Sequence, residues 1–232
     1  MAELAGHLTG LGWVTDLWVG GSLASGGYVP GVIDLDLVAL VEGPVDADRT
    51  ATLTAVHRGL DSGIGAGLDL GCVYVDGARL GEVTVVHPMW THGTLVSRSL
   101  SGIARAELVL DGYAVTGRPP SAVLPPVSAD DVRDSARAEV AGYWAHAVRH
   151  PWWWLDPVMP DLGLTSMARA RNEASTGELL TKTRAIEAAH APGWLVEQMR
   201  ARRHGEPVVS PRLRSAVIAW NDARRTVANM TR

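Results

Sequence analysis

The chain has 232 residues, of which 47% are hydrophobic and 20% charged, the balance of an ordinary globular protein. This length suits one large domain or two modest ones. The formal net charge of −4 lacks the basic excess of a typical nucleic-acid binder, so we do not expect nucleic acid as a partner. A mildly acidic protein instead suits a cationic small molecule.

The single cysteine and the hydropathy pattern bear on the compartment. Cys72 excludes an internal disulfide framework and fits a reducing environment. The first residues lack the basic start and the long apolar stretch of a signal peptide, and no apolar run reaches the length of a membrane span. We therefore expect no membrane partner and a cytoplasmic location, where ATP is available.

The first half of the sequence alternates between helical and strand patterns. Three helices are predicted, at residues 4–12, 45–60 and 95–110. Four strands are predicted, at residues 17–19, around 34–37, at 68–75 and at 82–87. The last two strands are close enough to form a hairpin, so the pattern predicts a mixed sheet.

A proline-rich stretch, RPPSAVLPPVS at residues 118–128, is the clearest linker, because proline interrupts regular structure. Beyond it the pattern is helical throughout. Five helices are predicted, at residues 128–149, 162–175, 178–189, 193–203 and 210–229. The expected fold class is α+β, with a mixed-sheet domain at residues 1–120 and an all-α helical-bundle domain at residues 128–232.

Two aspartates stand two residues apart on the second predicted strand. Side chains alternate along a strand, so Asp34 and Asp36 share one face. Their charges repel, and a hard cation such as Mg²⁺, which also carries nucleotide phosphates, relieves that repulsion. Gly21 lets backbone N–H groups approach a phosphate, and a helix start behind Ser22 adds positive potential. We predict a magnesium site at the aspartates and phosphate binding at Gly21 and Ser22.

If a hydroxyl group attacks the bound phosphate, another side chain must accept the proton of that hydroxyl. Glu82, at the start of an apolar predicted strand, is the leading candidate, as base, metal ligand or both. Asp69, on the preceding strand, is the rival third carboxylate, although its position indicates a strand-edge residue.

Gly21-Ser22, a spacer and Asp34-x-Asp36 resemble the signature of the nucleotidyltransferase superfamily related to DNA polymerase beta. In that superfamily the Gly-Ser holds the nucleotide's terminal phosphates and the two aspartates hold Mg²⁺. The run from Glu82 to His87 resembles the strand that carries the catalytic glutamate in streptomycin/spectinomycin adenylyltransferases. The resemblance implies an N-terminal nucleotidyltransferase domain, ATP as co-substrate, and catalytic roles for Glu82, Asp34 and Asp36.

The helical half resembles the same enzymes. Arg169, then Thr176-Gly177, then Lys182 match the spacing of the family's nucleotide clamp, which implies that Arg169 and Lys182 bind the ATP phosphates. The sequence also departs from the pattern. Ile33 replaces the small hydroxyl residue that usually precedes the first aspartate, and the family's Trp and Asp five residues apart are not reproduced.

Three adjacent tryptophans, Trp152 to Trp154, cannot all face one core. At least one is expected to line a cleft or a partner surface, where Asp156 and Asp161 would suit an amine-bearing substrate. Packing of the tryptophans between the two domains is the equally weighted alternative.

These observations predict a Mg²⁺-dependent enzyme, with its active site in an interdomain cleft, that moves AMP from ATP to a hydroxyl of an aminoglycoside-like antibiotic. One alternative is a toxin-type nucleotidyltransferase that modifies tRNA or a protein. Another is a non-catalytic nucleotide sensor, against which the intact carboxylates argue. A dinucleotide-binding fold is a weaker alternative, since the glycine spacing differs from G-x-G-x-x-G.

Overall fold

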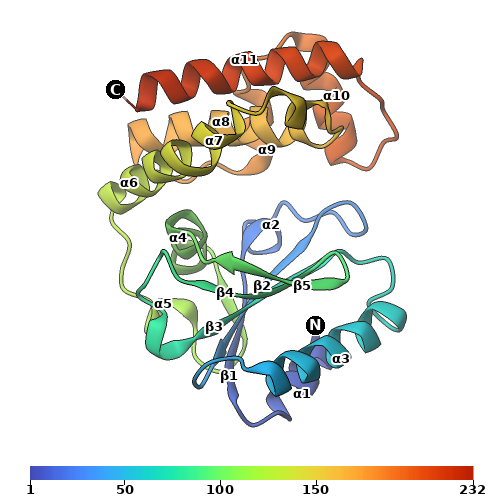
Figure 1. Cartoon of the computed structure of the whole chain (residues 1–232), viewed down its shortest axis with the longest axis vertical. Helices are drawn as coiled ribbons and strands as arrows, with labels where there is room; N and C mark the ends of the chain where they lie inside the picture. Colours follow the sequence, from blue (N-terminus) through green and yellow to red (C-terminus); the bar gives the residue numbers. More distant parts are fainter. Residues whose placement is uncertain (232) are drawn as a thin grey trace. The chain divides into compact units, whose positions relative to one another are not determined.

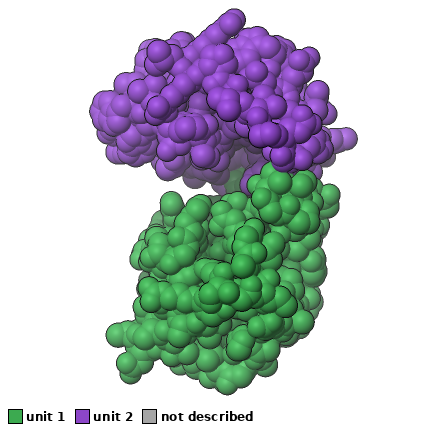
Figure 2. Space-filling model, turned by 90° about the vertical axis from the view of Figure 1, so that its right-hand side faces the viewer, with its two compact units in different colours: residues 1–127 green, residues 128–232 purple. Residues whose placement is uncertain are grey.

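The computed structural model describes residues 1–231, which fall into two compact units that divide between Val127 and Ser128 (Figure 2). The first unit is a sheet with helices, and the second is helical (Figure 1). This confirms the predicted α+β fold class. In the part of the chain that is described, no helix is both long and apolar enough to cross a membrane.

The first unit is built on a six-stranded sheet in the order β5-β4-β3-β2-β1-β6. The strands are β1 (Val14–Val19), β2 (Leu35–Val41), β3 (Leu70–Asp76), β4 (Val86–Thr91), β5 (Thr94–Ser99) and β6 (Tyr113–Thr116). Strands β2 and β3 run parallel, and the other neighbouring pairs are antiparallel. The helix α3 (Ala47–Ser62) connects the parallel pair, because such a pair needs a crossover. The mixed sheet is as predicted.

Helices cover both faces of this sheet (Figure 1). The helix α1 (Ala2–Thr9) and α3 bury their leucines against one face, which β2 meets with Leu37 and Ala39. The helix α4 (Gly102–Leu110) and the short α5 (Pro120–Val123) cover the other face, which β2 meets with Val38 and Leu40. Because side chains alternate, the even-numbered Asp36 belongs to the α4 face.

The predicted strand at 82–87 is wrong. Residues 80–85 form a loop after the short 3₁₀ helix η1 (Gly77–Arg79), and β4 begins only at Val86. Pro88 lies within β4 opposite Ser97 of β5, since a proline removes one donor without preventing an extended backbone. The expected pairing of the third and fourth strands is present, with these shifted bounds.

The predicted helix at 95–110 is half wrong. Its first part is the strand β5, and α4 begins after Ser101, whose hydroxyl accepts a hydrogen bond from the Ala104 N–H at 3.1 Å. This N-cap fixes the helix start that the apolar pattern alone did not locate. The segment predicted as a linker also contains α5, which is followed by the buried Leu124.

The second unit consists of helices around a core that includes Trp144, Trp154 and Met167. Its elements are α6 (Ala129–Glu139), the π-helix η2 (Val140–Trp144), α7 (Ala145–Ala147), the 3₁₀ helix η3 (Pro151–Leu155), α8 (Met159–Thr176), α9 (Lys182–Glu187), α10 (Gly193–Arg203) and α11 (Arg212–Met230). The helix predicted at 178–189 is shorter than expected, because the Thr181 hydroxyl caps it by accepting the Arg184 N–H.

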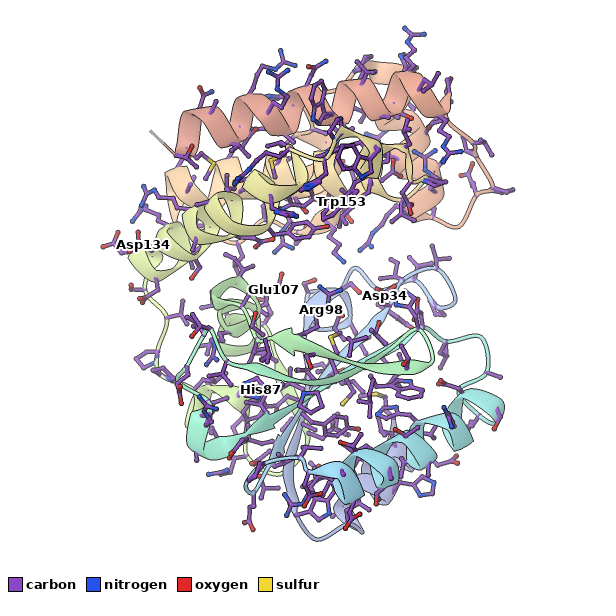
Figure 3. All side chains as sticks on the ribbon, viewed as in Figure 1. Asp34, His87, Arg98, Glu107, Asp134 and Trp153 are labelled. Carbon is purple, nitrogen blue, oxygen red and sulfur yellow. The ribbon has the colours of Figure 1, made fainter. Side chains whose placement is uncertain are left out.

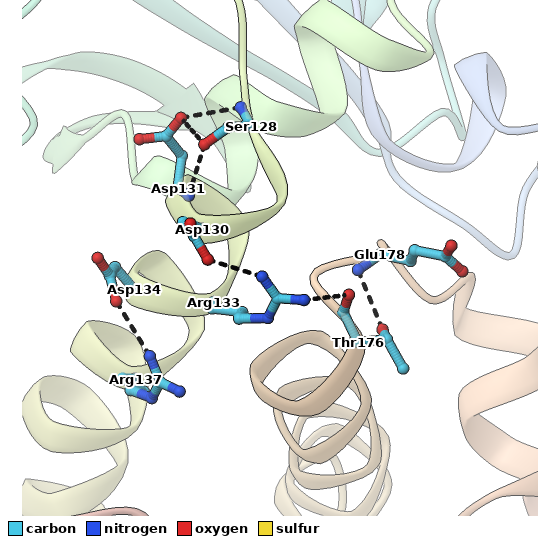
Figure 4. A network of polar contacts seen from close by, with 8 residues as sticks. All are labelled: Ser128, Asp130, Asp131, Arg133, Asp134, Arg137, Thr176 and Glu178. Atoms are coloured by element: carbon cyan, nitrogen blue, oxygen red, sulfur yellow. Dashed lines mark hydrogen bonds and ion pairs between the residues drawn. The ribbon is translucent and has the colours of Figure 1, made fainter.

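Polar contacts tie the start of α6 to the end of α8 (Figure 4). Ser128 and Asp131 form a reciprocal capping box at the first turn of α6. Arg133, one turn later, donates to the Asp130 carboxylate and to the carbonyl oxygen of Thr176 at 2.9 Å. The last turn of α8 is therefore held in place, just before the segment that leads to Lys182.

Candidate functional site

The two aspartates of the Asp-x-Asp motif lie at the start of β2. Asp34, labelled in Figure 3, is exposed and precedes the strand. Asp36 is half-buried within the strand. In the parallel register with β3, Asp36 stands opposite Gly71. One step earlier the Leu35 N–H donates to the carbonyl oxygen of Asp69 at 2.7 Å, so the pairing continues beyond the strand ends. Asp34 and Asp69 therefore stand at the same end of neighbouring strands.

Gly21 and Ser22 begin the one-turn helix α2 (Gly21–Ala24) directly after β1. Gly21 has φ +57°, and a Cβ there would collide with the Asp36 carboxylate oxygen Oδ2. On its other side Asp36 faces Gly71, where an added Cβ would lie 3.9 Å from Oδ1. Gly21 thus makes room for this carboxylate, whereas a side chain at Gly71 would meet it only at ordinary contact distance. The structure brings Gly21, Ser22, Asp34 and Asp36 together.

The Ser22 side chain is buried, and its hydroxyl oxygen has no hydrogen-bond partner among the residues described. A buried polar atom without a partner costs free energy in a folded protein, and such atoms gather where a ligand completes the bonding. Ser22 lies beside the glycine that contacts Asp36. The Ser22 hydroxyl is therefore a buried group that a ligand could satisfy.

Asp69 is a third carboxylate at this end of the sheet. Its side chain is 45% exposed, and its Oδ2 lies 3.5 Å from Nε2 of His92. His92 occupies the β4–β5 turn with φ +48°. The sequence contained a signal for this placement: two strands joined by one helix run parallel, so the residues that precede them meet at one edge.

Glu82 is not brought to this group. It follows β3, whereas Asp34 and Asp36 lie beside the residues that precede it, so the length of β3, roughly 20 Å at about 3.3 Å per residue, separates them. The exposed Glu82 carboxylate binds Arg79 through two hydrogen bonds of 3.0 Å, which hold its pKa below the usual range. In this structure Glu82 therefore does not lie with the other predicted site residues.

Arg169 and Lys182 belong to the helical unit. Arg169 lies in α8 with its side chain 17% exposed, and its Nε donates to the buried Glu173 at 3.2 Å. Lys182 is exposed at the first position of α9. The left-handed Gly177 ends α8 between them, and a Cβ there would collide with Ala129. The turn that separates the two cations is thus fixed by packing within this unit.

The three tryptophans divide as their adjacency requires. Trp154 is buried in the core of the helical unit, and its Nε1 donates to the carbonyl oxygen of Ala147 at 3.1 Å. Trp152 is 61% exposed and Trp153 36% exposed. Asp161 forms an ion pair with Arg202 at 2.7 Å, so its charge is already matched.

The two motif aspartates suit Mg²⁺ by their chemistry, because this ion prefers oxygen ligands. Within residues 1–231 no three or more His, Cys, Asp or Glu side chains are grouped to hold a metal ion on their own. Mg²⁺ is commonly held by one or two carboxylates together with substrate phosphates and water.

No protein-family model matches the sequence, and a search of curated proteins finds no match. The architecture, a mixed-sheet unit followed by a helical unit, is shared with a solved structure. The chain has the fold of spectinomycin adenyltransferase AAD(9) from Enterococcus faecialis, crystallised with ATP and spectinomycin. The TM-score is 0.69 at 13% identity, and the match covers 100% of this chain and 96% of that one.

Proposed function

We propose that the protein is a Mg²⁺-dependent nucleotidyltransferase that moves AMP from ATP to a hydroxyl of a cationic, aminoglycoside-like small molecule. The arrangement that carries this proposal is the meeting of Asp36 with Gly21, beside Asp34 and Asp69, at one end of two parallel strands. The fold shared with an adenyltransferase solved with ATP and spectinomycin supports the same assignment.

In this proposal, Asp34 and Asp36 hold Mg²⁺, which would neutralise charge on the triphosphate. Gly21 and the Ser22 hydroxyl receive the terminal phosphates, since the first N–H groups of α2 have no acceptor within the helix. Arg169 and Lys182 add positive charge for the phosphates, Arg169 through its planar fork and Lys182 as a point charge.

Asp69 takes the role of proton acceptor in place of Glu82. The substrate oxygen attacks the α-phosphorus, its proton passes to the Asp69 carboxylate, and pyrophosphate leaves with the electrons of the broken P–O bond. His92, 3.5 Å from Asp69, orients this carboxylate. Because β2 and β3 are parallel, Asp34, Asp36 and Asp69 all stand near the start of these two strands, at one end of the sheet.

The acidic character of the first unit suits a cationic acceptor. Asp and Glu outnumber Lys and Arg in residues 1–127, whereas the reverse holds for residues 128–232. A negative potential around the three carboxylates would attract protonated amines and raise the rate of encounter. This favours a polyamine-bearing small molecule over a polyanionic acceptor such as tRNA.

The test is pyrophosphate release from ATP and MgCl₂ in the presence of spectinomycin, streptomycin and other aminoglycosides, with a parallel tRNA reaction. We expect release with at least one cationic compound, loss of release with EDTA, and loss in Asp36→Asn. Release with tRNA alone would favour the toxin-type function. ATP binding without release on any acceptor would favour a nucleotide sensor.

A further inference from the structure

A cluster of two imidazoles and two indoles lies on the surface of the helical unit and includes none of the residues assigned to the proposed reaction. His146 comes from α7, His150 immediately precedes η3, and Trp152 and Trp153 lie within η3. The imidazole ring centroids are 4.2 Å apart, with 38° between the ring planes. His146 is exposed and His150 is half-buried, so the pair is accessible to solvent.

One hydrogen bond fixes which nitrogen carries the proton when the His150 ring is neutral. Its Nδ1 lies 2.9 Å from the carbonyl oxygen of His146. A carbonyl oxygen only accepts, so Nδ1 carries the proton and the lone pair of a neutral ring is on Nε2. Histidine ligands of metals characteristically donate their other ring N–H in this way, often to a backbone carbonyl. A neutral His150 ring therefore has the free Nε2 lone pair that a metal ion requires.

Aromatic contacts hold both rings in place. Trp153 (labelled in Figure 3) stacks on His150 with centroids 4.8 Å apart and 17° between planes, and its ring centroid lies 5.2 Å from that of His146. Trp152 meets His150 edge to face at 5.1 Å. The π-helix η2, a type of distortion found often at functional sites, comes directly before α7. Little side-chain freedom remains to be lost when a ligand binds.

From this arrangement we propose that His146 and His150 form a binding site for a late first-row transition-metal ion. Two imidazoles suit Cu²⁺, Ni²⁺ and Zn²⁺, whereas Mg²⁺ and Ca²⁺ prefer oxygen ligands. The chain supplies two ligands, and water completes the coordination. The site is distinct in chemistry from the aspartates of β2, and the affinity order should place Cu²⁺ above Ni²⁺ and Zn²⁺.

The experiment is calorimetric titration of the tag-free full chain with CuCl₂ and with ZnCl₂, in a buffer that contains excess MgCl₂ to occupy the carboxylates. His146→Gln and His150→Gln are compared with His7→Gln, an exposed histidine whose Nε2 lies 3.9 Å from Glu3. We expect one saturable site in the native chain and in His7→Gln. Each cluster variant should bind at least about tenfold more weakly, since removing even an outer partner of a metal ligand costs 10- to 100-fold.

The electron paramagnetic resonance spectrum of bound Cu²⁺ gives a second readout, because it reports nitrogen ligation. Two-nitrogen ligation is expected in the native chain and one-nitrogen ligation in either cluster variant. Circular dichroism of the metal-free variants shows that they fold. Native affinity in His150→Gln, an unchanged copper spectrum, or no saturable site in the native chain would each overturn the proposal.

Discussion

Replacement of Asp69 by asparagine tests whether Asp69, rather than Glu82, accepts the proton of the substrate hydroxyl. Asp69→Asn keeps the shape of the side chain and removes its basic carboxylate. The residue is almost half exposed and its contact with His92 is at the surface, so folding should be nearly unaffected. Loss of a positioned proton acceptor typically lowers kcat by about 10²- to 10⁴-fold, or about 3 to 5 kcal/mol in activation free energy.

The matched control is Glu82→Gln. It breaks only the surface pair with Arg79, at the opposite end of β3, so kcat should stay within about twofold of the native value. The assay is steady-state pyrophosphate release with saturating acceptor, and the KM for ATP should change little in either variant. A large loss of kcat in Glu82→Gln with native kcat in Asp69→Asn would refute the assignment.

Three further variants test the site and the two cores. Gly21→Ala should abolish nucleotide binding, measured by calorimetry. Alanine is unfavourable at φ +57°, and its Cβ would displace the Asp36 carboxylate. Retained affinity for the nucleotide would contradict the close approach of Gly21 and Asp36. Burial lowers the pKa of His57 to about 4, from about 6.5 when unfolded. The unfolded state then binds the extra proton, so stability is full above pH 6.5 and falls by roughly 3 kcal/mol toward pH 4. The melting temperature of His57→Gln should depend less on pH across this range than that of the native chain. An equal dependence on pH would contradict the lowered pKa of His57. Gly163→Ala should lower the stability of the helical unit by about 1–3 kcal/mol, because its Cβ would strike the buried Trp154 ring; an unchanged denaturant midpoint would argue against that packing.

The Asp-x-Asp motif and its glycine turn could be predicted because their information is local. Alternation along one strand places Asp34 and Asp36 on one face, whatever the rest of the sheet does. The short spacing to Gly21 and Ser22 then allows β1 and β2 to bring the four residues together. The structure places them so, with Asp36 against Gly21.

The third carboxylate could not be chosen in the same way, because its position depends on pairing between strands far apart in the sequence. An apolar run after Glu82 resembled a strand, but the ladder with β3 begins only further along, at Met89 and Trp90. Asp69 appeared to be an edge residue until the parallel register set it beside Asp34. Strand register is a property of the packed sheet, which local propensity does not determine.

In the helical half, too, local features could be predicted from the sequence and packed arrangements could not. The capping box at Ser128 and the left-handed Gly177 mark helix ends that the sequence predicts. From the sequence alone His146 and His150 indicate only surface or structural histidines, because their spacing gains meaning once Trp153 and a backbone carbonyl orient the rings.

The most direct test of the proposed site is a crystal structure with a non-hydrolysable ATP analogue and Mn²⁺ in place of Mg²⁺, since Mn²⁺ gives an anomalous signal. The account predicts an anomalous peak within bonding distance of both Asp34 and Asp36, with the terminal phosphates against Gly21 and Ser22. A peak bound elsewhere, or a triphosphate that leaves the glycine turn empty, would contradict it.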